Sequence, residues 1–123
     1  METVQFSVHE FITIMGILNE QVRDGDGVAK DSVWHKWKDR YKKLDNELEK
    51  LDMMDRADML FDSKVTFDDV SKEHVAEVLT IVDGHIKHET QLIEDGDPDG
   101  DPDEVDIWKT VHARLETTLE MAD

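Results

Sequence analysis

The chain has 123 residues and no cysteine, and its 31 acidic residues against 14 basic ones give a formal net charge of −17 at pH 7. The length suits one domain over residues 1–123 with its own core, and the lack of cysteine excludes disulfides and thiolate zinc sites. The negative charge argues against direct binding of nucleic acid, because phosphates would be repelled. No apolar run is long enough to cross a membrane and the first residues do not form a signal peptide, so the sequence predicts a cytoplasmic protein without membrane contact.

Caps and apolar spacing predict the first two helices. Ser7 and Glu10 match a capping box, which predicts a helix that runs to about Arg23. A second helix should begin around Asp31 or Ser32. Its apolar residues recur every three or four positions and form a seam that needs a partner helix: Trp34, Trp37, Tyr41, Leu44, Leu48 and Leu51.

A run of basic residues flanks this second helix. It contains five of the 14 basic residues of the chain: Lys36, Lys38, Arg40, Lys42 and Lys43. Such a run usually faces solvent beside carboxylates, and a docking patch is the alternative interpretation.

The middle of the chain has a weaker pattern. A short helix is expected between Met53 and Asp62. Two triplets, Val4-Gln-Phe6 and Val65-Thr-Phe67, are alike and suggest short extended segments able to pair, although three residues do not decide it. Beyond them, a third helix is predicted from a cap at Asp69 or Ser71 to about residue 93, and a fourth from about residue 102 to the end.

The sequence contains an internal similarity that predicts a duplicated fold. Residues 23–52 align without a gap on residues 94–123, with nine identities. The identities include Asp24, Gly25 and Asp26 with Asp95, Gly96 and Asp97; Trp37 with Trp108; Leu44 and Leu48 with Leu115 and Leu119; and Asp52 with Asp123. We therefore predict an all-α fold, either a four-helix bundle or paired helix–loop–helix hairpins related by a pseudo-twofold axis. The hairpins would cover about 7–52 and 71–123, with a connector at about 53–70.

The segment Asp95-Gly-Asp-Pro-Asp-Gly-Asp-Pro-Asp-Glu-Val-Asp106 joins the third and fourth helices. Its aspartates fall on positions 1, 3, 5, 7, 9 and 12 of the segment, with Gly100 at position 6. In these residues the segment resembles the calcium-binding loop of an EF-hand, although Pro102 replaces the usual aliphatic residue at position 8 and Asp106 replaces the usual glutamate. The resemblance implies these calcium ligands: Asp95, Asp97, Asp99, Asp101 and Asp106. The repeated Asp-Gly-Asp-Pro is typical of a solvated acidic connector, which is the favoured interpretation.

Two His–Glu pairs lie on the predicted second hairpin. His85 and Glu89, and likewise His112 and Glu116, are four residues apart on one helical face, and the two histidines should share a layer. Two histidines and two glutamates that project inward would resemble the ligand set of a carboxylate-bridged di-metal or hemerythrin-like site. The alternative is that each histidine simply pairs with its glutamate.

The chain has no glycine-rich phosphate loop and no nucleophile signature, so it is not expected to be an enzyme or to need a cofactor other than calcium. Its charge predicts a small acidic helical interaction protein that docks on a basic surface of another protein. Nucleic-acid-mimicking inhibitors encoded by phages or mobile elements are of this kind. The carboxylates expected to bind the partner are Glu94, Asp97, Asp99, Asp101, Asp103 and Glu104. A calcium-binding helix–loop–helix module and a virion or assembly adaptor are the alternatives.

Overall fold

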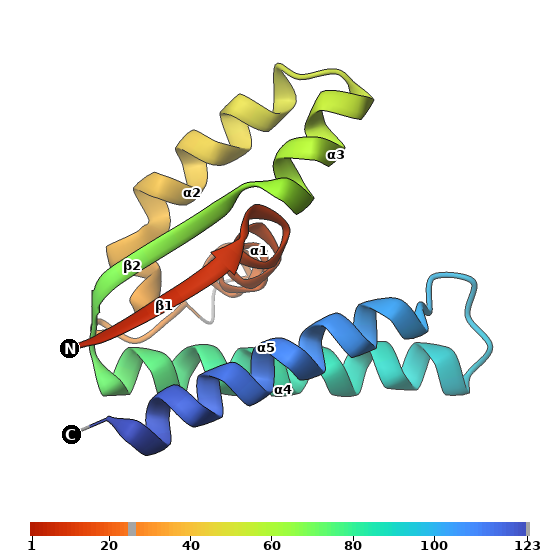
Figure 1. Cartoon of the computed structure of the whole chain (residues 1–123). Helices are drawn as coiled ribbons and strands as arrows, with labels where there is room; N and C mark the ends of the chain where they lie inside the picture. Colours follow the sequence, from red (N-terminus) through yellow and green to blue (C-terminus); the bar gives the residue numbers. More distant parts are fainter. Residues whose placement is uncertain (25–26, 123) are drawn as a thin grey trace. The chain divides into compact units, whose positions relative to one another are not determined.

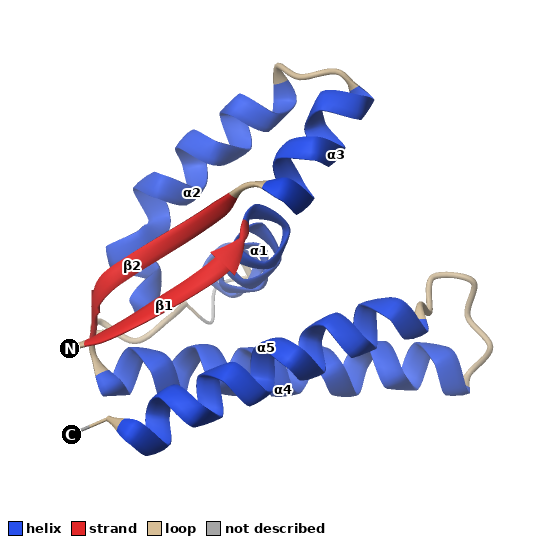
Figure 2. Cartoon of the chain, viewed as in Figure 1, coloured by secondary structure: helices blue, strands red, loops and turns tan. Residues whose placement is uncertain are grey.

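The computed structural model describes residues 1–24 and 27–122 (Figure 1). The elements in chain order are β1 (Glu2–Ser7), α1 (Val8–Arg23), α2 (Val33–Glu49), α3 (Met53–Asp62), β2 (Lys64–Val70), α4 (Lys72–Glu94) and α5 (Pro102–Met121). The described residues are mostly helical, as predicted, but β1 and β2 form a two-stranded sheet (Figure 2). The all-α prediction is therefore wrong for residues 2–7 and 64–70, which form strands. No helix in the described ranges is long and apolar enough to cross a membrane.

The chain divides into two compact units, one formed by Thr3–Asp68 and the other by Met1–Glu2 with Asp69–Asp123. The segment predicted as a connector, 53–70, contributes α3 and most of β2 to the first unit. The bundle and the pseudo-twofold repeat stay predictions. Of the residues that support the repeat, Gly25, Asp26 and Asp123 lie outside the described residues.

The helices of the first unit begin at the caps that the sequence contains. The Ser7 hydroxyl accepts the Glu10 N–H at 3.1 Å and the Glu10 carboxylate accepts the Ser7 N–H at 2.9 Å, which completes the capping box of α1. Ser32 accepts the Trp34 N–H at 3.2 Å and starts α2. Each cap satisfies an N–H that the first helical turn leaves without an intrahelical partner.

The sheet pairs the two triplets Val4–Phe6 and Val65–Phe67, an arrangement that the sequence suggested but did not decide. β1 and β2 run in opposite directions (Figure 2). Val4 and Phe6 of β1 and Val65 of β2 are buried, in the alternation expected for strands with one covered face. On the exposed face, the Gln5 amide donates to the Thr66 hydroxyl at 3.1 Å.

An aromatic cluster forms the centre of this core. Trp37 of α2 stacks on Phe67 of β2, with ring centroids 4.4 Å apart. Phe11 of α1 lies 5.9 Å from Trp37 and 5.4 Å from Phe67, and Phe6 of β1 meets Trp37 edge-on at 6.1 Å. Two helices and both strands therefore meet at one indole ring, whose side chain is only 1% exposed.

In the second unit, α4 and α5 lie side by side and run in opposite directions (Figure 1). Ser71 caps α4 by accepting the His74 N–H at 3.1 Å, and Asp101 caps α5 ahead of Pro102 at the first helical position. The helices bury a set of branched apolar side chains and one tryptophan: Val75, Val78, Val82, Val105, Trp108, Val111 and Leu115. Trp108 is buried as expected, but its ring neighbour is His85 at 5.0 Å, so its surroundings differ from the aromatic cluster around Trp37.

Candidate functional site

The acidic segment between α4 and α5 begins with a Schellman motif. The Asp97 N–H donates to the Leu92 carbonyl at 2.9 Å and the Gly96 N–H donates to the Ile93 carbonyl at 3.1 Å. Gly96 has a φ of 71°, in the left-handed region that favours glycine. The sharp turn of the loop therefore falls at its second residue.

Gly100 has a different role from the turn glycine of an EF-hand. Among the described residues, positive φ angles occur only at Gly27 and Gly96. A Cβ at Gly100 would lie 2.9 Å from the backbone nitrogen and 3.0 Å from the Cα of Ile93. Gly100 thus allows the loop backbone to lie against Ile93 at the end of α4. This close contact explains the glycine at this position, whereas in an EF-hand the glycine takes a sharp turn.

Three loop aspartates accept hydrogen bonds from the loop itself or from the end of α4. Asp97 accepts the Asp99 N–H, Asp101 accepts the Asp103 N–H, and Asp95 accepts the Gln91 amide, each at 2.9 Å. Within residues 1–24 and 27–122, no group of three or more His, Asp or Glu is arranged to hold a metal ion. Calcium binding by these aspartates with Asp106, which is exposed on α5, therefore stays a prediction from residue spacing.

The carboxylates expected to bind a partner are mostly open to solvent. Glu94, Asp99, Asp101 and Asp103 are exposed, and Asp97 and Glu104 are half-buried. In the part of the chain that the structure describes, no ion pair neutralises Asp97, Asp99, Asp101, Asp103 or Glu94. The loop therefore carries several exposed anionic groups close together in the chain, without ion-pair partners among the described residues.

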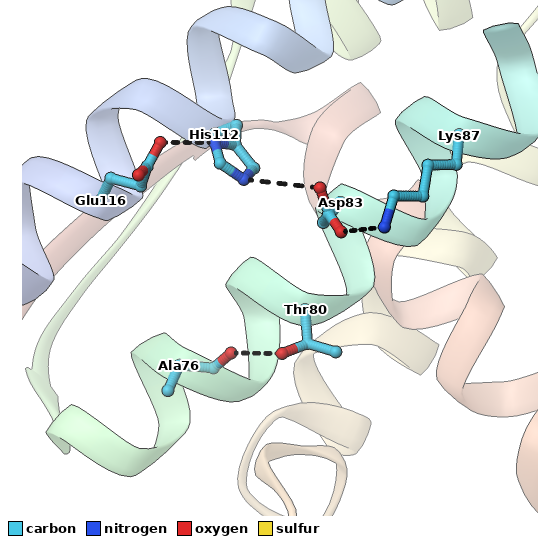
Figure 3. Close-up of polar contacts among 6 residues, drawn as sticks. All are labelled: Ala76, Thr80, Asp83, Lys87, His112 and Glu116. Atoms are coloured by element: carbon cyan, nitrogen blue, oxygen red, sulfur yellow. Dashed lines mark hydrogen bonds and ion pairs between the residues drawn. The ribbon is translucent and has the colours of Figure 1, made fainter.

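His112 lies in a polar network between α4 and α5 (Figure 3). Its Nδ1 is 2.8 Å from Oε1 of Glu116, and its Nε2 is 3.8 Å from Oδ1 of Asp83 on α4. The other Asp83 oxygen is 3.0 Å from Nζ of Lys87, so Asp83 is shared between a lysine on its own helix and a histidine on the next. One turn earlier on α4, the Thr80 hydroxyl donates to the Ala76 carbonyl at 3.1 Å (Figure 3).

His85 occupies a more covered position on the same hairpin. Its Nε2 is 3.8 Å from Oε1 of Glu89, and its ring meets Trp108 at an interplanar angle of 79°. Each histidine therefore pairs with the glutamate four residues later in its helix. This is the arrangement expected if the histidines do not bind a metal. Sequence reasoning missed Asp83. Its spacing to Lys87 was available as a signal, whereas its contact with His112 depends on the register of the hairpin.

The basic run on α2 is largely exposed. Lys36, Arg40, Lys42 and Lys43 face solvent, and Lys38 is half-buried. The Arg40 guanidinium lies 5.8 Å from the centroid of the Phe67 ring, within the range of a cation–π contact. At least this member of the run thus contributes to packing against β2.

Sequence reasoning also missed an apolar surface on α3. Met53 is 85% exposed, Met54 78% and Phe61 55%, and none of the ten residues of this helix is buried. The signal was present in the clustered methionines, but without a clear period it did not show which side faces the core.

Comparisons with protein-family models, curated proteins and solved structures find no match for the chain.

Proposed function

We propose that this chain is a small acidic helical interaction protein that docks on a basic surface of another protein. The docking surface is the acidic loop, defined as residues 94–104. The observation that carries the proposal is its row of exposed carboxylates, of which Glu94, Asp99, Asp101 and Asp103 have no ion-pair partner among the described residues.

The physical reason is electrostatic. Neighbouring anions without counter-charges repel one another, and a basic partner relieves this repulsion. The chain as a whole carries −17, so its long-range field attracts the same partner and raises the association rate. Salt screens such a field within about 8 Å at physiological ionic strength, so the association rate should fall steeply as salt rises.

The proposed partner class is a protein whose basic surface normally holds nucleic acid. Closely spaced carboxylates present several anions to a partner, as a phosphate backbone does, and lysines and arginines that donate to phosphates can also donate to carboxylates. The chain would then act as an inhibitor that occupies the site. The calcium-binding and assembly-adaptor alternatives have no comparable observation in their favour.

The test is a charge-neutralised loop with a matched control. In one variant, Asp97, Asp99, Asp101 and Asp103 are replaced by asparagine, which keeps the oxygens that accept the Asp99 and Asp103 N–H groups. The control removes four exposed charges from α2 instead, by Asp39→Asn, Asp45→Asn, Glu47→Gln and Glu49→Gln.

Association is measured with the protein that co-purifies with the tagged wild-type chain from a native lysate. The loop variant should associate about tenfold more slowly or worse at low salt, the control should change less, and duplex DNA should displace the wild-type chain. An unchanged rate for the loop variant would reject the loop as the docking surface. Weakening by charge reversal at Lys36–Lys43, with no effect of the loop variant, would assign docking to the basic run of α2.

A further inference from the structure

Helix α3 has three distinct sides. At about 100° per residue, Met53, Met54, Ala57 and Phe61 fall within one third of the helix circumference. All four are exposed, and they are called the α3 apolar face below. Next to this face lies a row of three exposed aspartates, Asp55, Asp58 and Asp62. The remaining third carries Met59 and Leu60, which are half-buried, together with Arg56.

The inward side of α3 is fixed to the rest of the first unit. The Arg56 side chain donates to the Leu48 carbonyl at 3.0 Å and to the Leu51 carbonyl at 3.2 Å, at the end of α2. At the other end of α3, the Ser63 carbonyl accepts the Val8 N–H at 3.1 Å. These bonds hold the orientation of the helix and leave Met53 and Met54 open to solvent. The Phe61 ring lies 4.9 Å from the His9 ring of α1 and is 55% exposed, so the α3 apolar face is partly covered at that end.

The aspartate row has no counter-charge in the described ranges. No ion pair involves Asp55, Asp58 or Asp62, and the nearest cation along the helix, Arg56, is used by the α2 carbonyls. The exposed apolar residues and an unneutralised acidic edge therefore lie side by side along one helix.

We propose that the α3 apolar face is the docking site for a basic amphipathic helix of a partner protein. Its apolar residues at positions 53, 57 and 61 follow one helical stripe about 12 Å long, which matches two to three turns of a partner helix. Exposed methionines adapt to different apolar partners. The aspartate row selects a partner with lysines or arginines along one edge of its apolar stripe.

A second copy of this chain is the less favoured occupant. Two α3 helices in contact would bring their aspartate rows together, and each chain carries a formal charge of −17. The same charge attracts a basic helix. This surface is separate from the acidic loop and relies on apolar anchors, so it does not depend on the function proposed above.

The test uses the full-length chain and a fluorescently labelled helical peptide of leucine and lysine, with its leucines on one face. A peptide of the same composition with shuffled leucines is the control probe. Met53→Gln with Met54→Gln removes the anchors at two side chains that are 85% and 78% exposed, and circular dichroism verifies that the fold is kept. Asp58→Asn with Asp62→Asn removes charge from the edge, and Asp99→Asn with Asp103→Asn removes equal charge from the acidic loop.

The amphipathic peptide should bind more tightly than the shuffled one, and the methionine variant should weaken its binding about tenfold. Neutralising the α3 edge should weaken it more than neutralising the loop. Equal binding of both peptides, no effect of the methionine variant, or an equal effect of the two charge variants would overturn the proposal. A wild-type dimer in sedimentation that the methionine variant abolishes would also overturn it, since a second copy would then cover the face.

Discussion

The indole of Trp37 and the ring of Phe67 stack at 4.4 Å between centroids and 21° between planes. This contact joins α2 to β2, and Phe6 and Phe11 pack against the same indole. Offset-stacked and edge-on aromatic rings contribute about 0.5–1.5 kcal/mol per pair beyond the burial of their area. The first unit is therefore held together at one position by four of its elements.

Replacement of Trp37 by alanine should destabilise the fold by about 3–5 kcal/mol, because it leaves a large cavity in this cluster. Trp108→Ala should have an effect of the same order, since its side chain is also fully buried. Urea unfolding followed by circular dichroism measures both. A loss below about 1 kcal/mol at both positions would remove the case for equivalent tryptophans in a duplicated hairpin.

Gly100→Ala should destabilise the chain by about 1–3 kcal/mol, because the added Cβ would meet the backbone of Ile93 at 2.9–3.0 Å. Gly84→Ala is the matched control. Gly84 lies inside α4 with nothing within 4 Å of a Cβ there, so alanine should stabilise the helix by about 0.5–1 kcal/mol. Thermal melting of the two variants should shift in opposite directions. A shift of the same sign would refute the close-approach role of Gly100.

Calcium at millimolar concentration should leave the melting temperature unchanged. Three of the candidate ligands already accept hydrogen bonds within the loop or from α4, and Gly100 does not take the left-handed turn. Isothermal titration and a melting curve with and without calcium measure this. A single binding event that Asp95→Ala with Asp99→Ala abolishes would instead establish the EF-hand-like site.

The pKa of Tyr41 should lie above its ordinary value of 10.0 in the folded chain, because partial burial and then the charges of Asp45 and Glu20 disfavour the phenolate. The unfolded chain then loses this proton at lower pH than the folded chain. The stabilising contribution is therefore complete below pH 10.0 and is lost as pH rises through the folded pKa.

Tyr41 is the only tyrosine, so tyrosinate absorbance reports on it alone. The transition should occur at higher pH in the native chain than in denaturant, and Asp45→Asn should move the native transition down because it removes one of the charges. Coincident transitions in the native and denatured chain would contradict the expected shift.

The features that the sequence by itself determined depend on interactions between residues a few positions apart. Ser7, Ser32 and Ser71, which were among the cap candidates in the sequence, cap three helices, and the fourth helix begins at Pro102 as expected. Each cap accepts a hydrogen bond from an N–H two or three residues later, so a short stretch of sequence is enough to predict it. The pairing of His85 with Glu89 and of His112 with Glu116 follows from the helical spacing in the same way.

Only the tertiary structure decided the features that join distant parts of the chain. β1 pairs with β2 across a separation of 61 residues at the Gln5–Thr66 contact, and strands this short have no local signal strong enough to place them. Asp83 meets His112 only because the hairpin sets its register. The direction of the α3 apolar face depends on bonds from Arg56 to α2, so the clustered methionines could be read in the sequence but their exposure could not.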